Sequence, residues 1–391
     1  MSTEAASFAR RAPYQFSSKL SSGLLTTAGF GGLIFLIGTM VAPDRVWCGY
    51  LMGFTYFVGL ALAGPLFLSV IYLSGARWAQ PLRRIPEAMT TALPVALVLG
   101  LGLIMGTHAL YEWSHPQVVE SDALLVHKAP YLNVIGFSVR LVTYFSIWIW
   151  IGYKVAARSK ATADQTEWRR RNMTLSALFM AMLAITFSLA SVDWVQSLDP
   201  HWFSTMFALR TLAGVGCSGL ALCTIVLVGL RNKGPLRTIV TRDVMDDLGK
   251  IMLALSLFWA YIWYCEYMII WYTDIPEETG YYLLREQGDW ATLLPVNLII
   301  NFALPFLALM LRSWRRSGVV LTRIAVLMLF GHAVDLYMMI APPVLGSELQ
   351  LGLWELGPVI GALALFGWIL LRALSRDALV PTDVPGEAAP Y

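Results

Sequence analysis

Ten apolar runs, each long enough to cross a lipid bilayer, constrain this sequence more than any other feature. A membrane-spanning helix needs about 20 apolar residues, because each residue adds about 1.5 Å across a hydrocarbon core about 30 Å thick. The 391 residues are 57% hydrophobic and only 14% charged. The sequence therefore predicts an all-α, polytopic membrane protein. The ten runs are 21–42, 46–75, 87–113, 131–156, 172–195, 202–230, 248–272, 291–311, 319–342 and 353–371.

The basic residues are distributed unevenly between the two sets of connecting loops. Of the 28 Lys and Arg residues, only Arg45, Lys128 and Arg285 fall in one set, while Arg140 and Arg210 fall within runs. Loops rich in Lys and Arg stay in the cytoplasm. We therefore expect both termini to be cytoplasmic. The ten-helix domain would cover 21–375, after an uncleaved N-terminal segment 1–20 and before a tail 376–391.

A weak internal repeat divides eight of the runs into two sets of four. The fifth run ends in Ala-Ser-Val-Asp193-Trp and the ninth contains His332-Ala-Val-Asp335-Leu. The third ends in Tyr-Glu112-Trp and the seventh in Cys-Glu266-Tyr. The repeat indicates two four-helix bundles, at about 46–195 and 202–342, flanked by the first and tenth helices.

The ionisable residues deep in the runs gather in the outer half of the predicted domain. Asp193 and Arg210 have opposite charges at similar depth, so we expect them to pair or to share a wet cavity, because an unpaired charge in a membrane is costly. Buried acids and histidines suit proton relay, and we expect Asp193 to belong to one. The alternative is a set of structural contacts between helices. The proton-path candidates are His108, Glu112, Arg140 and Asp193 in the first bundle, and Arg210, Glu266, His332 and Asp335 in the second.

The outer loops predict a second kind of site. Asp199-Pro200 is typical of an N-cap followed by a first-turn proline, so we expect the sixth helix to start there. Loops 111–133 and 272–290 are long, acidic and aromatic, which favours a docking surface for an outer-side protein or a lid packed on its own bundle. The docking candidates are His115, His201, Trp202, Asp274, Glu277, Glu278 and Arg285.

Several kinds of site lack a motif. The four cysteines lie in apolar runs without the spacings that bind iron–sulfur clusters or attach c-type haem. His108 and His332 are the only pair for a b-type haem, and His108 lies almost at the surface. No nucleotide-binding or zinc-protease motif occurs. We therefore expect no metal, no catalytic residue and no cofactor in this chain, and no nucleic-acid partner.

Three stretches carry a family resemblance. They are Leu110-Tyr-Glu-Trp-Ser-His115, Asp193-Trp-Val-Gln-Ser-Leu-Asp-Pro-His-Trp-Phe-Ser-Thr205 and Trp271-Tyr-Thr-Asp-Ile-Pro-Glu-Glu-Thr279. Taken in this order and at these helix ends, the chain resembles the F subunit of alternative complex III, a bacterial quinol:electron-acceptor oxidoreductase. That subunit is similar to its paralogue, the C subunit, and to the membrane subunits of polysulfide and nitrite reductases.

The resemblance implies a subunit of the bacterial inner membrane that scaffolds a respiratory or photosynthetic electron-transport complex and conducts protons. It would not itself be the redox-active subunit, although quinone or menaquinone is the complex's small-molecule substrate. The implied partners are the lipid bilayer, the C subunit, and outer-face subunits that carry iron–sulfur clusters and c-type haems. Two alternatives stay open, a quinol-binding subunit of the same complex and a secondary transporter. A transporter would interrupt matching helices of both halves, whereas only the eighth run, with Pro295 and Pro305, is interrupted.

Overall fold

The chain is helical throughout the part that is described. The computed structural model describes residues 14–76, 79, 83–157, 165–234, 236–237, 239–376 and 378–379, without the side chains of 165–169. Among these residues there is no β-strand. Residues 1–13 and 380–391, which belong to the predicted end segments, lie outside them.

Ten spans are long and apolar enough to cross a membrane, as in a multi-pass membrane protein, which confirms the predicted number. Seven are single helices, and three are built from consecutive helical pieces. In chain order they are α2 (Ser18–Val41), α3 (Pro43–Ser74), α4 (Arg84–Thr90) with α5 (Leu93–Met105), α9 (Val134–Ala157), α10 (Gln165–Trp194) with η3 (Gln196–Leu198), α11 (Phe207–Asn232), α12 (Arg242–Thr273), α14 (Trp290–Leu298) with η4 (Ile299–Ala303) and α15 (Leu304–Met310), α17 (Gly318–Leu345), and α18 (Leu353–Leu374).

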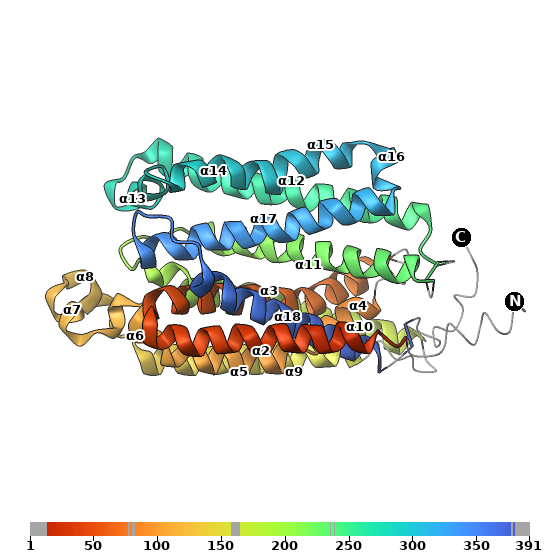
Figure 1. The fold of residues 1–391 in the computed structure, drawn as a ribbon, viewed down its shortest axis with the longest axis horizontal. Helices are drawn as coiled ribbons and strands as arrows, with labels where there is room; N and C mark the ends of the chain where they lie inside the picture. Colours follow the sequence, from red (N-terminus) through yellow and green to blue (C-terminus); the bar gives the residue numbers. More distant parts are fainter. Residues whose placement is uncertain are drawn as a thin grey trace, which may run out of the picture.

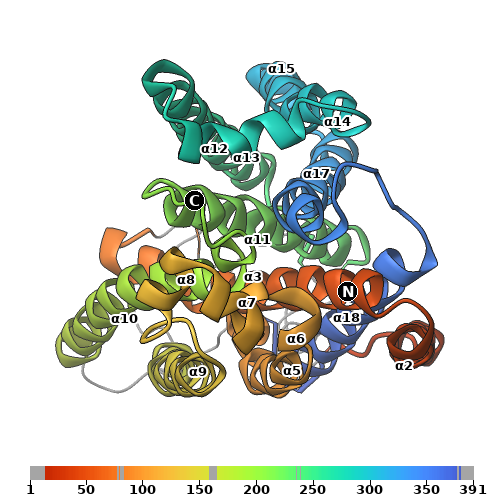
Figure 2. The ribbon, with the colours of Figure 1, turned by 90° about the vertical axis from the view of Figure 1, so that its left-hand side faces the viewer.

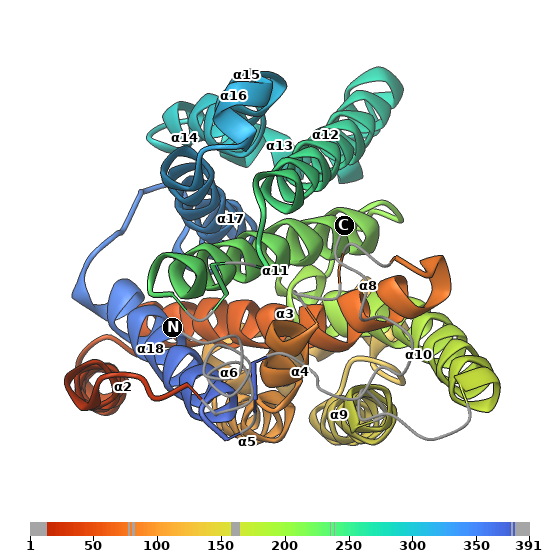
Figure 3. The same ribbon diagram turned by 90° about the vertical axis from the view of Figure 1, so that its right-hand side faces the viewer.

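Helices α3 and α11 lie side by side at the centre of the molecule when it is viewed from either end (Figures 2 and 3). Helices α2, α5, α9, α10 and α18 lie around α3, and α12, α14, α15 and α17 lie on the side of α11 (Figure 2). Small residues bring the two central helices together: a Cβ added at Gly219 of α11 would lie 2.2 Å from the Cβ of Ala63 in α3. Such small residues are typical of close helix crossings in membranes.

The two ends of the molecule differ (Figure 1). One end, which we call the capped end, carries the short helices α6 (Thr107–Leu110), η2 (Glu112–Ser114), α7 (Pro116–Ser121), α8 (Ala123–Lys128) and α13 (Pro276–Arg285). At the opposite end, which we call the basic end, α2 and α12 begin, α18 ends, and α16 (Arg312–Arg315) lies (Figure 1). Among the described residues, Arg242, Arg312, Arg315 and Arg372, which belong to the loops predicted to be cytoplasmic, lie at this end.

Two predicted boundaries are wrong. The third span ends at Met105 and not at 113, because Gly106 leaves the helical conformation beneath the ring of Trp47, where a Cβ would lie 2.2 Å from the ring. The sixth helix begins at Phe207 and not after Pro200. The carbonyl of Asp199 accepts a hydrogen bond from the amide of Trp202 (3.2 Å), which closes a turn instead of starting a helix.

The eighth span contains a π-helical turn, η4, between α14 and α15. Pro305 has no N–H, so it cannot bond to the carbonyl of Asn301 one turn earlier. That carbonyl instead accepts a hydrogen bond from the hydroxyl of Ser256 in α12, at 2.5 Å. A neighbouring side chain thus satisfies the backbone group that the proline frees, as a helix in lipid requires.

Candidate functional site

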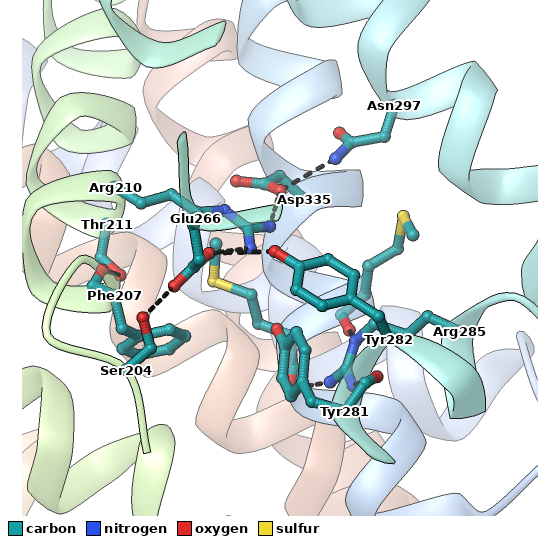
Figure 4. Close-up of polar contacts among 12 residues, drawn as sticks. Ser204, Phe207, Arg210, Thr211, Glu266, Tyr281, Tyr282, Arg285, Asn297 and Asp335 are labelled. Atoms are coloured by element: carbon teal, nitrogen blue, oxygen red, sulfur yellow. Dashed lines mark hydrogen bonds and ion pairs between the residues drawn. The ribbon is translucent and has the colours of Figure 1, made fainter. Parts of the chain in front are cut away.

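Three groups of arginine and carboxylate side chains lie in the helices close to the capped end. They are Arg45 with Glu355, Arg140 with Asp193, and Arg210 with both Glu266 and Asp335. The first two groups contain one cation and one anion each. The third contains one cation and two anions. The buried cation Arg285, which donates to the carbonyls of Met338, Met339 and Tyr281, lies close to this group (Figure 4).

Asp193 near the end of α10 pairs with Arg140 of α9 and not, as expected, with Arg210. Arg140 Nε and Nη2 each donate to one carboxylate oxygen at 2.9 Å, and the hydroxyl of Tyr144 donates to Oδ2 at 2.8 Å. The guanidinium also lies 3.9 Å above the ring of Tyr131. The predicted pair is wrong because α9 and α10 pack against each other, whereas Arg210 faces α12 and α17. The Arg140–Asp193 pair is bidentate and charge-balanced, so it needs no proton.

Arg45 in the first turn of α3 forms a similar balanced pair with Glu355 in the first turn of α18. Its Nε donates to Oε1 at 2.5 Å and its Nη2 donates to Oε2 at 3.0 Å. Glu355 is buried, and it also accepts from the amide of Gly352. The sequence analysis missed this pair, although an acid in an apolar first turn was a signal for it.

Arg210, in the first turn of α11, lies between two carboxylates from other helices (Figure 4). Its Nη1 donates to Glu266 Oε2 of α12 at 3.0 Å, and its Nη2 donates to Asp335 Oδ1 of α17 at 2.7 Å. The three side chains are at most 4% exposed. The sequence analysis placed Glu266 and Asp335 in one cluster, and the structure brings Arg210 to them.

Four further side chains donate hydrogen bonds to these carboxylates (Figure 4 shows three of them). Glu266 accepts from the hydroxyls of Ser204 (2.7 Å) and Tyr282 (3.3 Å). Asp335 accepts from Asn297 Nδ2 (2.9 Å) and from Trp259 Nε1 (3.3 Å). Burial, together with the nearby Glu266, raises the pKa of Tyr282 well above its usual value, so this hydroxyl stays a donor.

The Arg210 group carries one more negative charge than positive when both carboxylates are ionised. An uncompensated charge in a buried site costs several kcal/mol even after the structure relaxes. Protonation of one of the two carboxyl groups would remove that cost. Each of the four carboxylate oxygens accepts at least one hydrogen bond from the surrounding donors.

A line of polar groups leads from Asp335 toward the basic end. Asn297 donates to Asp335 and accepts from Asn301 Nδ2 at 2.6 Å, and the carbonyl of Asn301 accepts from Ser256. The next buried acid of α12 is Asp246, ten residues before Ser256 and thus about 15 Å along the helix. Tyr261 and Tyr264, which also lie in this part of α12, are exposed on the outside of the helix.

His332 is buried one turn before Asp335 on α17. Within the described part of the chain, neither of its ring nitrogens has a hydrogen-bond partner. The edge of its ring meets the face of Trp259, with ring centroids 5.5 Å apart. His332 therefore adjoins the Arg210 group without bonding to it.

Two predicted members of the first cluster lie elsewhere. His108 and Glu112 follow the end of the third span at Met105, and both are exposed. His108 Nδ1 lies 3.0 Å from the hydroxyl of Ser114. The cluster prediction is wrong for both residues, because the break at Gly106 carries them out of the helix.

Two further buried acids lie at the basic end, at helix starts and not deep in a helix. Glu87, in the first turn of α4, is buried at the basic end and pairs with Arg84 at 2.5 Å. Asp246, the fifth residue of α12, is buried there with Arg315 at 2.7 Å. Both acids lie near the N-terminal ends of their helices, where carboxylates are favourable.

Two docking candidates are buried inside the chain. Trp202 stacks on Tyr281 of α13, with centroids 3.9 Å apart. Arg285 donates to the carbonyls of Met338 (2.8 Å) and Met339 (3.2 Å) near the end of α17. The segment after α12 is therefore a helix packed on its own neighbours, and neither residue can make a direct surface contact with a partner.

The other docking candidates are not buried. Asp274 follows α12 in a left-handed conformation (φ 49°) and is exposed, as are Glu277, His115 and His201, while Glu278 is partly exposed. His201 Nε2 contacts Asp122 Oδ2 at 2.8 Å. Partial burial by itself would raise the pKa of Asp122. Hydrogen bonds from the amides of Leu124 and Leu125, together with the neighbouring His201, outweigh this effect and lower the pKa. This contact ties the α7–α8 segment to the turn before α11.

Among the residues that the structure describes, no group of three or more His, Cys, Asp or Glu side chains could hold a metal ion. Cys48, Cys217 and Cys223 are buried and Cys265 is partly buried, and all four are unpaired. No protein-family model matches the sequence, and a search of curated proteins finds no match.

Proposed function

We propose that this chain is a proton-binding, cofactor-free membrane subunit of a quinol-oxidising complex of the alternative complex III type. The observation that carries the proton-binding role is the excess of one carboxylate over arginine in the buried Arg210 group. The choice of complex rests on the sequence resemblance at 110–115, 193–205 and 271–279. Quinol oxidation releases protons, so a subunit beside the reaction needs a group that takes them up.

The hydroxyl groups around Glu266 suit proton exchange with the capped end. Ser204 and Tyr282 link Glu266 to the segments there, and hydroxyl groups can pass a proton along a hydrogen-bonded line. On the other side, Asn297, Asn301 and Ser256 form a hydrogen-bonded line toward the basic end, but a neutral amide does not bind and release a proton. Ordered water would have to carry a proton in that direction.

The two-bundle repeat supports a scaffolding role. Asp193 and Asp335 occupy matching places in the predicted bundles, and each accepts a hydrogen bond from the preceding span, from Arg140 and Asn297 respectively. In this proposal the basic end faces the cytoplasm of a bacterial cell, with both termini there. The capped end, with exposed Asp274 and Glu277, faces the subunits that carry iron–sulfur clusters and c-type haems, and the C subunit lies alongside.

Infrared spectroscopy of the purified chain in a lipid bilayer tests the proton site. We expect the C=O stretch of one protonated carboxyl group at neutral pH. Both Glu266→Gln and Asp335→Asn should abolish it, because either change leaves a single carboxylate balanced by Arg210. Glu266→Gln is the cleaner probe, because the new NH2 group can donate to Ser204 Oγ while the amide oxygen accepts from Arg210 and Tyr282. In Asp335→Asn, the new NH2 group would face a donor in either orientation of the amide, because both oxygens of Asp335 accept hydrogen bonds.

The matched control is Glu355→Gln, which removes an acid from a balanced pair and should leave the infrared band unchanged. A wild-type chain without the band, or a band that survives in both variants, would contradict the proton site. The complex is tested separately by mass spectrometry of proteins and quinones that co-purify with the native chain. Recovery without quinone, iron–sulfur or haem subunits would contradict the assignment to a quinol-oxidising complex.

A further inference from the structure

A small cavity lies beside Asp335, between α3, α10, α11 and α17. Its volume is about 40 Å³, which is room for roughly two or three water molecules and far too little for an organic ligand. Most of its wall is apolar. The lining residues whose side chains carry polar atoms are Thr55, Tyr56, Ser191, Trp194, Thr211, Ser218, His332 and Asp335.

Four polar atoms of residues that line this cavity are buried and lack a partner in the described part of the chain. They are both ring nitrogens of His332, the hydroxyl oxygen of Thr55 and Nε1 of Trp194. Whichever tautomer His332 adopts, one ring nitrogen carries a hydrogen to donate and the other can accept. Buried polar groups are almost always hydrogen bonded to protein or to ordered water. A dry cavity would leave all four unsatisfied.

We infer that the cavity is a water-binding site, in which ordered waters bond to His332 and Thr55 and contact Asp335. An empty cavity of this size is stable only when its lining is apolar, and four buried polar atoms without partners make this one different. Water is the only ligand class that fits the volume and can both donate and accept.

The waters would give Asp335 a route for proton exchange separate from Arg210 and Asn297. Neutral His332 can accept a proton at one nitrogen and release one from the other, with water on both sides. This role deepens the proposed function and rests on it, because it needs a proton at the Arg210 group. The presence of the waters does not depend on the proposed function.

The chain offers a matched pair of substitutions on one helix. A Cβ at Gly214 of α11 would lie 3.6 Å from His332 Nδ1, an ordinary contact, so Gly214→Ala places a methyl group in the cavity without a clash. A Cβ at Gly216 would lie 3.8 Å from Leu255, away from the cavity, so Gly216→Ala is the control. Both changes replace glycine by alanine inside a helix, which favours the helix equally. Thr55→Val removes one polar atom while keeping the side-chain shape.

X-ray hydroxyl-radical footprinting of the chain in lipid detects bound water, because radicals formed from it label neighbouring side chains. We expect labelling of Tyr56 and Met339, which line the cavity, in the wild type and in Gly216→Ala. We expect its loss in Gly214→Ala and its reduction in Thr55→Val. Wild-type labelling absent at both residues, or unchanged in Gly214→Ala, would overturn the water site.

The exchange route has its own measurement. In heavy water, the rate at which the protonated carboxyl band shifts should fall in Gly214→Ala and stay at the wild-type value in Gly216→Ala. An unchanged rate in Gly214→Ala would overturn the route. If the wild type lacks the band but its cavity is labelled, the proton site has failed while the water site stands, so the two failures are distinguishable.

Discussion

At the scale of single residues, the balance of charge within each buried group separates Asp193 from Asp335. Both are aspartates near the capped end of spans that match in the predicted repeat. Asp193 is the sole counter-charge of Arg140, whereas Asp335 shares Arg210 with Glu266. The geometry therefore favours Asp335 and Glu266, and not Asp193, as the groups that exchange a proton.

The same substitution should consequently destabilise the fold by different amounts at the two positions. Asp193→Asn leaves Arg140 without an anion and should destabilise the fold by about 3 kcal/mol, at the lower end of the range for broken buried pairs, because Arg140 remains 19% exposed. Asp335→Asn leaves Arg210 balanced by Glu266 and should cost less. Thermal unfolding of both variants in the same detergent measures the difference.

Reversing the first pair provides the control. Asp193→Arg combined with Arg140→Asp should recover part of the stability that Asp193→Asn loses, because the charges balance again. Equal unfolding temperatures for Asp193→Asn and Asp335→Asn would contradict the distinction between a balanced and an unbalanced group.

Which arginine meets which acid could not be predicted from the sequence. The runs set the depth of each charge, but the rotation of each helix about its axis and the choice of neighbour set the partner. Arg210 was expected beside Asp193 because the two are close in sequence and depth, yet its partners lie 56 and 125 residues away. Arg45 and Glu355 are 310 residues apart.

At the scale of elements, the predictable features are those that follow from length and composition. Ten spans were predicted because the run length needed to cross a bilayer is a strong signal. The irregularity of the eighth span was visible in Pro295 and Pro305. The break at Gly106 was not visible in the sequence, because it depends on the ring of Trp47 from another helix. The helix at 276–285 was treated as a loop, although its alternative role as a packed lid was kept open.

Arg285 holds this helix, α13, against the rest of the molecule. Its guanidinium donates to Met338 and Met339 of α17 and to the carbonyl of Tyr281, and it lies 3.3 Å from the centre of the Tyr281 ring. Arg285→Ala should leave these buried carbonyls without donors, at a local cost of about 2 to 3 kcal/mol. We expect faster hydrogen exchange in 275–286, measured by mass spectrometry.

The control for α13 is Glu277→Ala on its exposed face, which should leave exchange in 275–286 unchanged. Because Tyr282 of α13 donates to Glu266, release of the helix should also disturb the Arg210 group. Full protection of α13 in Arg285→Ala would show that the aromatic stacking of Tyr281 on Trp202 alone holds the helix.

At the scale of the whole molecule, the two ends differ in charge and in architecture. The described basic residues Arg242, Arg312, Arg315 and Arg372 lie at one end, and the exposed acids Asp274 and Glu277 lie at the other, where short helices cover the spans. Lys and Arg near a span strongly favour the cytoplasmic side. In the proposed orientation, the Arg210 group would lie close to the outer surface, on the side where the proposed quinol chemistry releases protons.

Thiol labelling in intact bacterial cells tests this orientation. In a chain whose four cysteines are replaced by alanine or serine, Ser121→Cys at the capped end should react with an impermeant reagent added from outside. Ser313→Cys at the basic end should react only after the cells are opened. Both serines are exposed, so access to the reagent and not burial decides the outcome. Labelling of Ser313→Cys alone in intact cells would invert the orientation. It would place the Arg210 group near the cytoplasm, where it could take up protons but could not receive those released outside.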